Sequence, residues 1–476
     1  MATTTRQLYV FAHLPEAPGG HFVPAGRLTL NEAHSPNPAL RELASEFAYG
    51  MRYLERPERF ELDPVSLSLA DLEAVRGKVL FPVHGLSEFG GIRDAAPDAW
   101  GRRVIEARRK APANSLSEAD YLLEAGGDRV GALDVRMALD SQGAPSASDL
   151  RSLGYLLQAA EAVEAGEPVP ANLMDLLGAG PSAGGARPKA SIRDDEGGLW
   201  LAKFPSLGDR FNVARAEMCT LALAQRCGLT MPEVRYLDIG NRPVMLIRRF
   251  DRYWLPDTAP ALPTGALHDT RPTLGSHEAR LPFVSGLTLA GCSEFDSRNR
   301  SYADLASAIR HHVHTDWIDQ NRRELFARMV FNVFVSNDDD HLRNHGFVRD
   351  PRIRGWQLSP LYDVVPRPGT AYERTLHLHL GAQGKLATLD NALSHFSAFV
   401  PERKTAIGII HRIWTVVRQW KTEFEGNGAD GRLIDQLDSA FRKLDDIASP
   451  ALAKQIRHGE SPHTGHTSRP GNTKIK

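Results

Sequence analysis

The feature that most constrains the fold of this chain is a long apolar segment that ends abruptly in a cluster of charge. In residues 322–335, RRELFARMVFNVFV, five apolar side chains recur at helical spacing: Phe326, Met329, Val330, Val333 and Phe334. A stripe of this kind predicts a helix that is buried against a core. Residues 336–347, SNDDDHLRNHGF, follow directly. We therefore expect Asn337 to Asn344 to form a loop at the end of a rigid, buried helix.

The three adjacent carboxylates of this loop repel one another. Such a run is either a solvated loop or a site at which a cation or a reacting group offsets the repulsion, and the run by itself leaves both open. His341 and His345 are four residues apart, but H-L-R-N-H lacks the glutamate of the zinc motif H-E-x-x-H. No frame supplies the glycine and glutamate of an EF-hand loop. The pattern therefore disfavours a site that only binds metal.

The spacing of polar residues around this loop instead favours phosphoryl transfer. Asp339 and Asn344 form D-x-x-x-x-N, and Asp363 follows a hairpin expected at about residues 347–358. Phosphoryl transfer uses one carboxylate to orient or deprotonate a hydroxyl, and an amide oxygen with a second carboxylate to hold magnesium. The spacing alone is a weak signal, and the histidine follows the aspartate here, whereas in kinases it precedes it.

Groups that suit ATP phosphates stand upstream in the matching order. Residues 178–190, GAGPSAGGARPKA, offer unhindered backbone N–H groups together with Arg187 and Lys189. In the predicted strand LWLAKF, alternation places Lys203 on an otherwise apolar face, which suits an ammonium that reaches an anion in a cleft. Glu217, on the next predicted helix, is a candidate partner for Lys203. A lysine that extends to solvent at a strand end and a surface glutamate are the alternative interpretations.

A competing motif overlaps the glycine-rich segment. Residues 180–184, GPSAG, fit G-x-S-x-G, in which Ser182 would be the nucleophile of a serine hydrolase. That motif requires an apolar strand before the serine and a helix after it. Here ANLMDLLGAG precedes it and GARPKASI leads into a hairpin, so the context disfavours the hydrolase and, for the same reason, a dinucleotide-binding fold.

The remaining pattern predicts a small antiparallel sheet at the start of the chain and helices from about residue 71 to 160, one of them capped by Ser148. A hairpin turns at RDDEGG, a helix ends at Gly228, and a strand pair turns at Gly240 and Asn241. Residues 253–277, rich in Pro, Thr and Gly, predict a mobile loop. From about residue 289 the chain reads as mainly helical.

Composition limits the partners of the chain. Its 476 residues include 57 Lys and Arg against 58 Asp and Glu, a formal net charge of −1. This balance argues against nucleic acid or a membrane surface as the main partner. The three cysteines have no C-x-x-C spacing, which is typical of reduced, buried thiols. Neither a signal peptide nor a membrane-spanning run is apparent, so the expected compartment is the cytoplasm.

Taken together, these stretches resemble the HipA family of toxin kinases. The resemblance runs from about Leu8 to Leu444 through FGGIRDAAPDAWGRRVIEARR, DYLLEAGGDRVGAL, GARPKASI, LAKF, LIRRFDR, SNDDDHLRNHGF and LSPLYDVVP. It implies an α+β, two-lobed protein-kinase-like fold with an additional N-terminal subdomain and a mainly helical C-terminal lobe. The implied divisions are 1–170 for the N-terminal subdomain, 171–285 for the N-lobe, 286–455 for the C-lobe and 456–476 for a disordered tail.

The resemblance also implies roles for single residues. Asp339 would be the catalytic carboxylate, Asn344 and Asp363 would hold Mg²⁺, and Ser182 would be a site of autophosphorylation that silences the enzyme. Glu217 and Asn337 would support the site, and the adenine contacts are expected within RLPFVSGLTL, residues 280–289. The expected ATP-binding residues are Ser182, Ala183, Gly184, Gly185, Ala186, Arg187, Lys189, Lys203, His341 and Asn344.

Partners follow from the same resemblance. It implies ATP-dependent phosphorylation of serine or threonine in a protein, among which aminoacyl-tRNA synthetases are known targets of the family. It further implies a HipB-like helix-turn-helix antitoxin, with DNA reached only through that antitoxin, and no membrane. The alternative is a catalytically weak member of the family that serves as the partner of a DNA-binding repressor.

Overall fold

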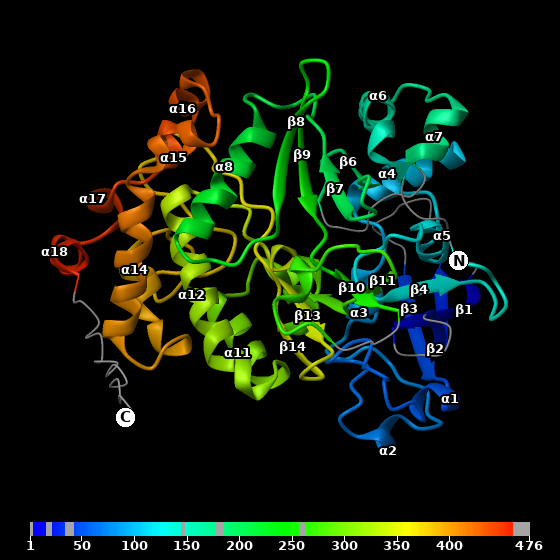
Figure 1. The fold of residues 1–476 in the computed structure, drawn as a ribbon. Helices are drawn as coiled ribbons and strands as arrows, with labels where there is room; N and C mark the ends of the chain where they lie inside the picture. The colour runs from blue at the N-terminus through cyan, green and yellow to red at the C-terminus, as the bar shows by residue number, and fades with distance from the viewer. Residues whose placement is uncertain are drawn as a thin grey trace, which may run out of the picture.

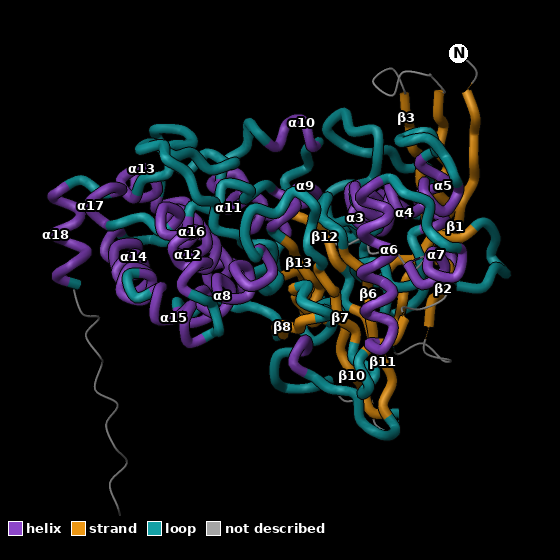
Figure 2. Tube along the Cα trace, turned by 90° about the horizontal axis from the view of Figure 1, so that it is seen from above, coloured by secondary structure: helices purple, strands orange, loops and turns teal. Residues whose placement is uncertain are grey.

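The computed structural model describes residues 3–15, 21–33, 42–143, 148–177, 185–257 and 262–459, and these residues form an α+β fold. Ser182, Ala183 and Gly184 lie outside the described residues. Strands and helices separate in space: Figure 2 shows most strands on one side of the molecule and a group of helices on the other. The N-terminal sheet lies far from the helices that end the described chain (Figure 1).

The predicted antiparallel sheet at the start of the chain is confirmed. It comprises β1 (Thr3–Leu14), β2 (His21–Ala33), β3 (Glu42–Tyr49) and β4 (Leu133–Arg136), in the order β3-β2-β1-β4. Its buried face includes Leu8, Val10 and Leu28, which pack under short helices. These helices are α1 (Met51–Leu54), α2 (Leu72–Val75), α3 (Gly90–Asp94) and α5 (Glu118–Glu124), whereas Trp100 and Val104 of α4 (Ala99–Arg109) pack in a separate core with Leu153 and Trp200.

Two details of the region predicted to be helical were wrong. Residues 133–136 form β4, because pairing with β1 outweighs the helical context. The predicted helix does not begin at Ser148, because Ser148 and Asp149 form β5, which pairs in parallel with β6. The side chain of Asp149 instead accepts a hydrogen bond from the backbone N–H of Ser152 and starts a 3₁₀ turn. The helices α6 (Leu153–Ala165) and α7 (Ala171–Leu177) follow.

The middle of the chain builds a five-stranded sheet in the order β5-β6-β7-β9-β8. Both predicted hairpins are confirmed: β6 (Lys189–Arg193) with β7 (Leu199–Lys203), and β8 (Val234–Asp238) with β9 (Pro243–Arg248). The second turns at Gly240 and Asn241, both with φ near +60° (60° and 64°), as a type I′ turn requires. α8 (Val213–Arg226) packs beside this sheet (Figure 1).

The predicted loop over residues 253–277 is partly wrong. β10 (Arg252–Pro256) pairs with β11 (Ser276–Arg280), so both ends of this segment are held in a two-stranded sheet. Tyr253 and Leu255 are fully buried there. Alternating apolar residues in RYWL therefore outweigh the Pro and Gly content of the segment between the strands. Residues 258–261 lie outside the described part.

The last part of the chain is mainly helical, as expected. α12 (Ile318–Val335) lies at its centre, and from Leu325 onward all its residues are buried. The helix ends at Ser336, whose φ is 52°, and residues 337–344 form the predicted loop. α12 packs against α11 (Tyr302–His312), α13 (Leu389–Ser394) and α14 (Arg403–Val417). The other helices of this part are α9 (Gly286–Leu289), α10 (Glu294–Ser297), α15 (Trp420–Gly426), α16 (Gly431–Leu437) and α17 (Leu444–Ile447).

A three-stranded sheet joins this helical part to the rest. It consists of β12 (Phe283–Ser285), β13 (Gly346–Asp350) and β14 (Gly355–Leu358), of which β13 and β14 are the predicted hairpin. α18 (Pro450–His458) continues past residue 456, so the expected tail begins later than predicted, and residues 460–476 lie outside the described part.

All three cysteines are buried and form no disulfide, as their spacing predicts. Among the described helices, none combines the length and the hydropathy that a membrane span requires.

Candidate active site

A cleft of about 760 Å³ lies between the five-stranded sheet and the helical part of the chain. It gathers residues that are far apart in the sequence. Candidate residues from the glycine-rich segment, the strand lysine, the aspartate loop and the segment after β14 all line it. They are Gly185, Ala186, Arg187, Lys189, Lys203, Asn337, Asp339, His341 and Asp363.

Lys203, at the end of β7, is held between two carboxylates. Its Nζ lies 2.5 Å from Oε1 of Glu217 on α8 and 2.8 Å from Oδ1 of Asp363. Burial acts to lower the pKa of the Lys203 ammonium, but the attraction of Asp363 and Glu217 outweighs burial and raises it above the usual range. Burial acts to raise the pKa of Asp363, yet Lys203 lowers it to about 2. The ammonium and the Asp363 carboxylate are therefore both ionised at neutral pH.

The three aspartates of residues 338–340 have different surroundings. Asp340 is 1% exposed and accepts hydrogen bonds from the hydroxyl of Tyr302 and the backbone N–H of His377, both at 2.6 Å. Burial raises its pKa to about 7. Asp338 and Asp339 are half-exposed, and Arg367 bridges them at 2.9 and 3.1 Å. Of the three, only Asp339 lines the cleft.

The other polar residues of the loop shape its backbone. The side-chain amide of Asn344 donates to the backbone carbonyl of Asp339 at 2.7 Å, which leaves its amide oxygen available to a cation. The side-chain amide of Asn337 is buried and donates to Oδ1 of Asn332 at 3.1 Å, so it anchors the loop to α12. His341 Nε2 lies 3.9 Å from a carboxylate oxygen of Asp339.

The two cations of the glycine-rich segment already have protein partners. Arg187 donates to both carboxylate oxygens of Asp209, at 2.7 and 2.6 Å. Lys189 is 2% exposed, and its ammonium contacts Asp98 at 2.7 Å and the carbonyl of Gly185 at 3.0 Å. Neither Asp98 nor Asp209 stands in a motif that would reveal it from the sequence. Lys189 therefore ties the loop to the start of α4, although it also lines the cleft.

Two residues at and beside the cleft carry donors that suit a magnesium ion: Asp363 lines the cleft, whereas Asn344, 7% exposed, is not among its lining residues. The Asp363 carboxylate and the Asn344 amide supply hard oxygen ligands, which Mg²⁺ prefers. Magnesium at phosphate-transfer sites is bound through one or two carboxylates and the substrate phosphates, so few protein ligands are needed. In the part of the chain that the structure describes, no group of three or more His, Cys, Asp or Glu side chains is arranged to hold a metal.

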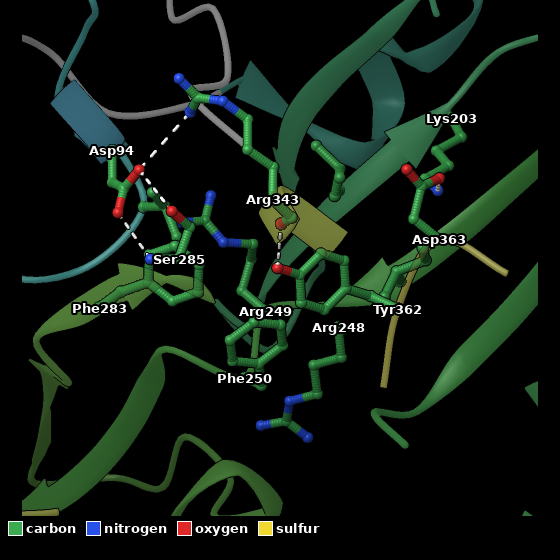
Figure 3. Close-up of a pocket in the computed structure, with 13 residues that line it drawn as sticks. Asp94, Lys203, Arg248, Arg249, Phe250, Phe283, Ser285, Arg343, Tyr362 and Asp363 are labelled. Carbon is green, nitrogen blue, oxygen red and sulfur yellow. Dashed lines mark hydrogen bonds and ion pairs between the residues drawn. The ribbon is translucent and has the colours of Figure 1, made fainter. Parts of the chain in front are cut away.

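A smaller, mainly apolar pocket of about 70 Å³ adjoins Lys203 and Asp363 (Figure 3). Phe283 and Ser285 line it, and both fall within the segment expected to contact adenine. Residues outside that segment contribute as well, including Arg248 to Phe250 at the end of β9. Two more come from the N-terminal subdomain, Asp94 and Val130. Sequence reasoning missed these contributors, because residues so distant in the chain show no spacing that links them.

The chain is similar in sequence to several known proteins. A family model described as the HipA-like C-terminal domain matches residues 181–420. The chain is 26% identical to a putative kinase, Y4dM, of Sinorhizobium fredii over 216 residues, which are 42% of this chain and 46% of that protein. It is also 26% identical to the serine/threonine-protein kinase toxin HipA of Shewanella oneidensis over 152 residues, 31% of this chain and 33% of the toxin. The chain thus spans less than half the length of these curated relatives.

A solved structure extends the likeness to the whole fold. The HipA chain in the Shewanella oneidensis complex of HipA, HipB and operator DNA matches with a TM-score of 0.58 and 13% identity, covering 94% of this chain and 95% of that chain. A match at this identity shows the fold alone. The expected α+β kinase-like fold is thereby confirmed.

Proposed function

This chain belongs to the family of proteins with a HipA-like C-terminal domain, and from that premise we propose that it is an ATP- and Mg²⁺-dependent serine/threonine protein kinase. The single observation that carries the proposal is the ammonium of Lys203, held between Glu217 and Asp363 at the wall of the cleft. A fixed, charged lysine beside two carboxylates is the arrangement that positions ATP phosphates next to a metal-binding aspartate in protein kinases.

The other residues of the cleft have different roles in the transfer of the phosphoryl group. Asp339 orients the hydroxyl of the protein substrate and accepts its proton as the oxygen attacks the γ-phosphorus, while the bond from that phosphorus to the β,γ-bridging oxygen breaks and ADP leaves. The N–H groups of Gly185 and Ala186 face the phosphate oxygens, and Lys203 binds phosphate oxygens once it exchanges its contact with Asp363. Arg367, next to Asp339, is a further cation at the mouth of the cleft. Such fixed charges stabilise the negative charge spread over the transferred phosphoryl group.

Asp363 and the amide oxygen of Asn344 would hold Mg²⁺, which when bound neutralises charge on the phosphates. The pairing of Asp363 with Lys203 keeps that carboxylate ionised and ready for a cation. The Asn344 amide is fixed by its bond to the carbonyl of Asp339, so the loop that carries the catalytic carboxylate also sets the position of a metal ligand.

Regulation and partners are part of the same proposal. Ser182, outside the described residues, is the proposed autophosphorylation site. A phosphate there would add about two negative charges near the phosphate-binding segment, and these would repel ATP and silence the enzyme. The substrate is a protein, an aminoacyl-tRNA synthetase being a candidate, and the working compartment is the cytoplasm. The relative of known fold was solved with HipB and operator DNA, which supports a HipB-like antitoxin as partner and contact with DNA only through it.

The test is incubation of purified protein with γ-labelled ATP and magnesium, in parallel with Asp339→Asn, followed by mass spectrometry of the peptide that contains Ser182. We expect phosphate on Ser182 in the parent and none in the variant. Label that persists in the variant would exclude Asp339 as the catalytic carboxylate. Binding of ATP without any label, also in the presence of candidate protein substrates, would favour the alternative function as a catalytically weak partner of a repressor.

A further inference from the structure

A carboxylate of the N-terminal subdomain lies buried against the segments that form the candidate active site. Asp94, at the end of α3, is 4% exposed. It accepts hydrogen bonds from the backbone N–H and the hydroxyl of Ser285, at 2.6 and 2.9 Å, and from the hydroxyl of Thr288 at 2.7 Å. Its Oδ1 also lies 3.6 Å from a guanidinium nitrogen of Arg343. Figure 3 shows this carboxylate between Ser285 and Arg343.

Arg343 connects Asp94 to the catalytic loop. It stands inside the D-x-x-x-x-N segment, immediately before Asn344. Its guanidinium also pairs with Glu294, with nitrogen to oxygen distances of 2.6 and 2.5 Å. Its backbone carbonyl accepts a hydrogen bond from the hydroxyl of Tyr362 at 2.7 Å, and Tyr362 directly precedes Asp363. A continuous chain of contacts therefore runs from Asp94 through Arg343 to the residue beside the metal-binding aspartate.

Close packing fixes the helix that carries Asp94. A Cβ added to Gly90 would lie 2.5 Å from side-chain atoms of Thr288, and one added to Gly91 would lie 2.1 Å from the carbonyl oxygen of Leu62. α3 thus packs directly against Leu62 on one side and against Thr288 of α9 on the other, with no room for a side chain at Gly90 or Gly91. A helix held on two sides positions its last carboxylate within a narrow range.

A buried carboxylate in this place has a high desolvation cost. Replacing a whole buried ion pair by apolar groups of similar size is often neutral or stabilising, so a buried ion pair is poor evidence of a stabilising role. The groups that contact the Asp94 carboxylate, by contrast, come from two segments that border the active site. Ser285 and Thr288 belong to β12 and α9, and Arg343 belongs to the catalytic loop. The carboxylate is therefore better explained by the geometry that it imposes than by stability.

We propose that Asp94 is a positioning residue for phosphoryl transfer: it fixes Arg343 and thereby the backbone of residues 339–344 relative to Tyr362 and Asp363. The inference deepens the proposed kinase function and rests on it for its catalytic consequence. The N-terminal subdomain then acts as a structural part of the catalytic loop, in addition to packing beside the kinase-like lobes.

The experiment compares three variants by amide hydrogen exchange and by kinetics. Asp94→Asn removes the charge at nearly constant volume, and Arg343→Gln breaks the same ion pair from the less buried side. Asp63→Asn is the matched control, because Asp63 is also fully buried and accepts from the backbone N–H of Gly91 on α3 at 3.1 Å, but does not contact the catalytic loop.

The first readout does not require turnover. Exchange of the backbone amides of residues 339–347 should accelerate about ten-fold in Asp94→Asn and in Arg343→Gln, and should stay unchanged in Asp63→Asn. Exchange in β7 should be unchanged in all three. Loop exchange equal to that of the parent in both Asp94→Asn and Arg343→Gln would overturn the inference, whether or not the protein is a kinase.

The second readout separates positioning from nucleotide binding. The kcat for phosphate transfer should fall about ten- to one-hundred-fold in Asp94→Asn, a larger factor than any rise in the Kd for ATP, although Asp94 also lines the small pocket. The double variant with Arg343→Gln should lose little more than either single variant. Parallel loss of kcat and ATP binding, or fully additive losses, would contradict a positioning role. An inactive parent with the predicted exchange pattern would refute the kinase function and leave the structural link intact.

Discussion

The ammonium of Lys203 lies 2.5 Å from a carboxylate oxygen of Glu217, in a contact that joins the edge of the cleft to the helix behind it. The Glu217 side chain is 3% exposed and that of Lys203 is 12% exposed, so water screens this pair little. A desolvated pair of this kind is rigid, and removal of one partner leaves the other as an uncompensated buried charge.

Replacing Lys203 should therefore lower both the rate of phosphate transfer and the free energy of unfolding, for two different reasons. Lys203→Met should lower phosphate transfer about 100-fold or more, because a fixed cation at the phosphates is lost. It should also lower the free energy of unfolding by about 3 kcal/mol, because Glu217 remains buried without its partner. Adding Glu217→Gln should restore stability without activity. Urea unfolding and γ-phosphate transfer measure the two effects, and recovery of activity in the double variant would contradict the role of Lys203.

The three aspartates of residues 338–340 should respond differently to neutralisation. Asp339→Asn should lower transfer about 100- to 10,000-fold at unchanged stability, because it removes the group that we propose accepts the substrate proton. Asp338→Asn should retain most activity, because Asp338 does not line the cleft. Phosphate-transfer assays on Asp338→Asn and Asp339→Asn measure which carboxylate the reaction requires, and thermal unfolding checks that both variants fold. Greater loss in Asp338→Asn would shift the catalytic role by one residue.

Asp340 should give the stability of the protein a specific pH dependence. Its pKa is about 7 in the folded protein, above the value of 3.8 for an exposed aspartate. The folded state thus holds this proton more tightly than the unfolded state, so the stabilisation is complete below pH 3.8 and is lost as the pH rises towards 7. Asn at this position does not titrate.

The free energy of unfolding of the parent should therefore decline relative to that of Asp340→Asn between about pH 4.5 and 7.5, by about 1.4 kcal/mol for each unit of pKa difference. Urea unfolding of both proteins across this range measures the difference. A difference that is independent of pH, or that grows as the pH rises, would contradict a raised pKa for Asp340.

Filling the small apolar pocket should block the nucleotide. Val130 lines it from the N-terminal subdomain and is 7% exposed. Val130→Phe should raise the Kd for ATP about ten-fold or more if the base occupies this pocket, at a cost in stability of about 1–3 kcal/mol from overpacking. Val130→Ala, which enlarges the pocket, is the matched control and should bind ATP within a few-fold of the parent. Equal ATP affinity in Val130→Phe and the parent would place the base elsewhere.

Local signals were sufficient for much of the fold. The alternation in LWLAK, the Gly240-Asn241 turn and the apolar stripe before Ser336 each predict an element that the structure contains. The misses share a cause. β4 and β5 are strands because β1 and β6 pair with them, and this pairing depends on chain segments that are distant in sequence.

The candidate site was predictable to the extent that its residues form motifs. D-x-x-x-x-N and a strand lysine indicate the chemistry, and their order along the chain indicates that they share one cleft. The partners of these residues were not predictable. Asp98 for Lys189, Asp209 for Arg187 and Asp94 for Arg343 are single carboxylates without a motif, brought close by the packing of separate elements.

The sequence by itself determined which chemical groups the site contains, because residue type and local spacing decide where helices end and which side chains share a strand face. Only the tertiary structure decided which carboxylate of residues 338–340 faces the cleft and which is buried under Tyr302. It also decided that Asp94 of the N-terminal subdomain reaches Arg343 in the loop of residues 337–344. The physical reason is that burial and ion pairing depend on neighbouring residues from distant segments of the chain. The local sequence does not reveal which residues these neighbours are.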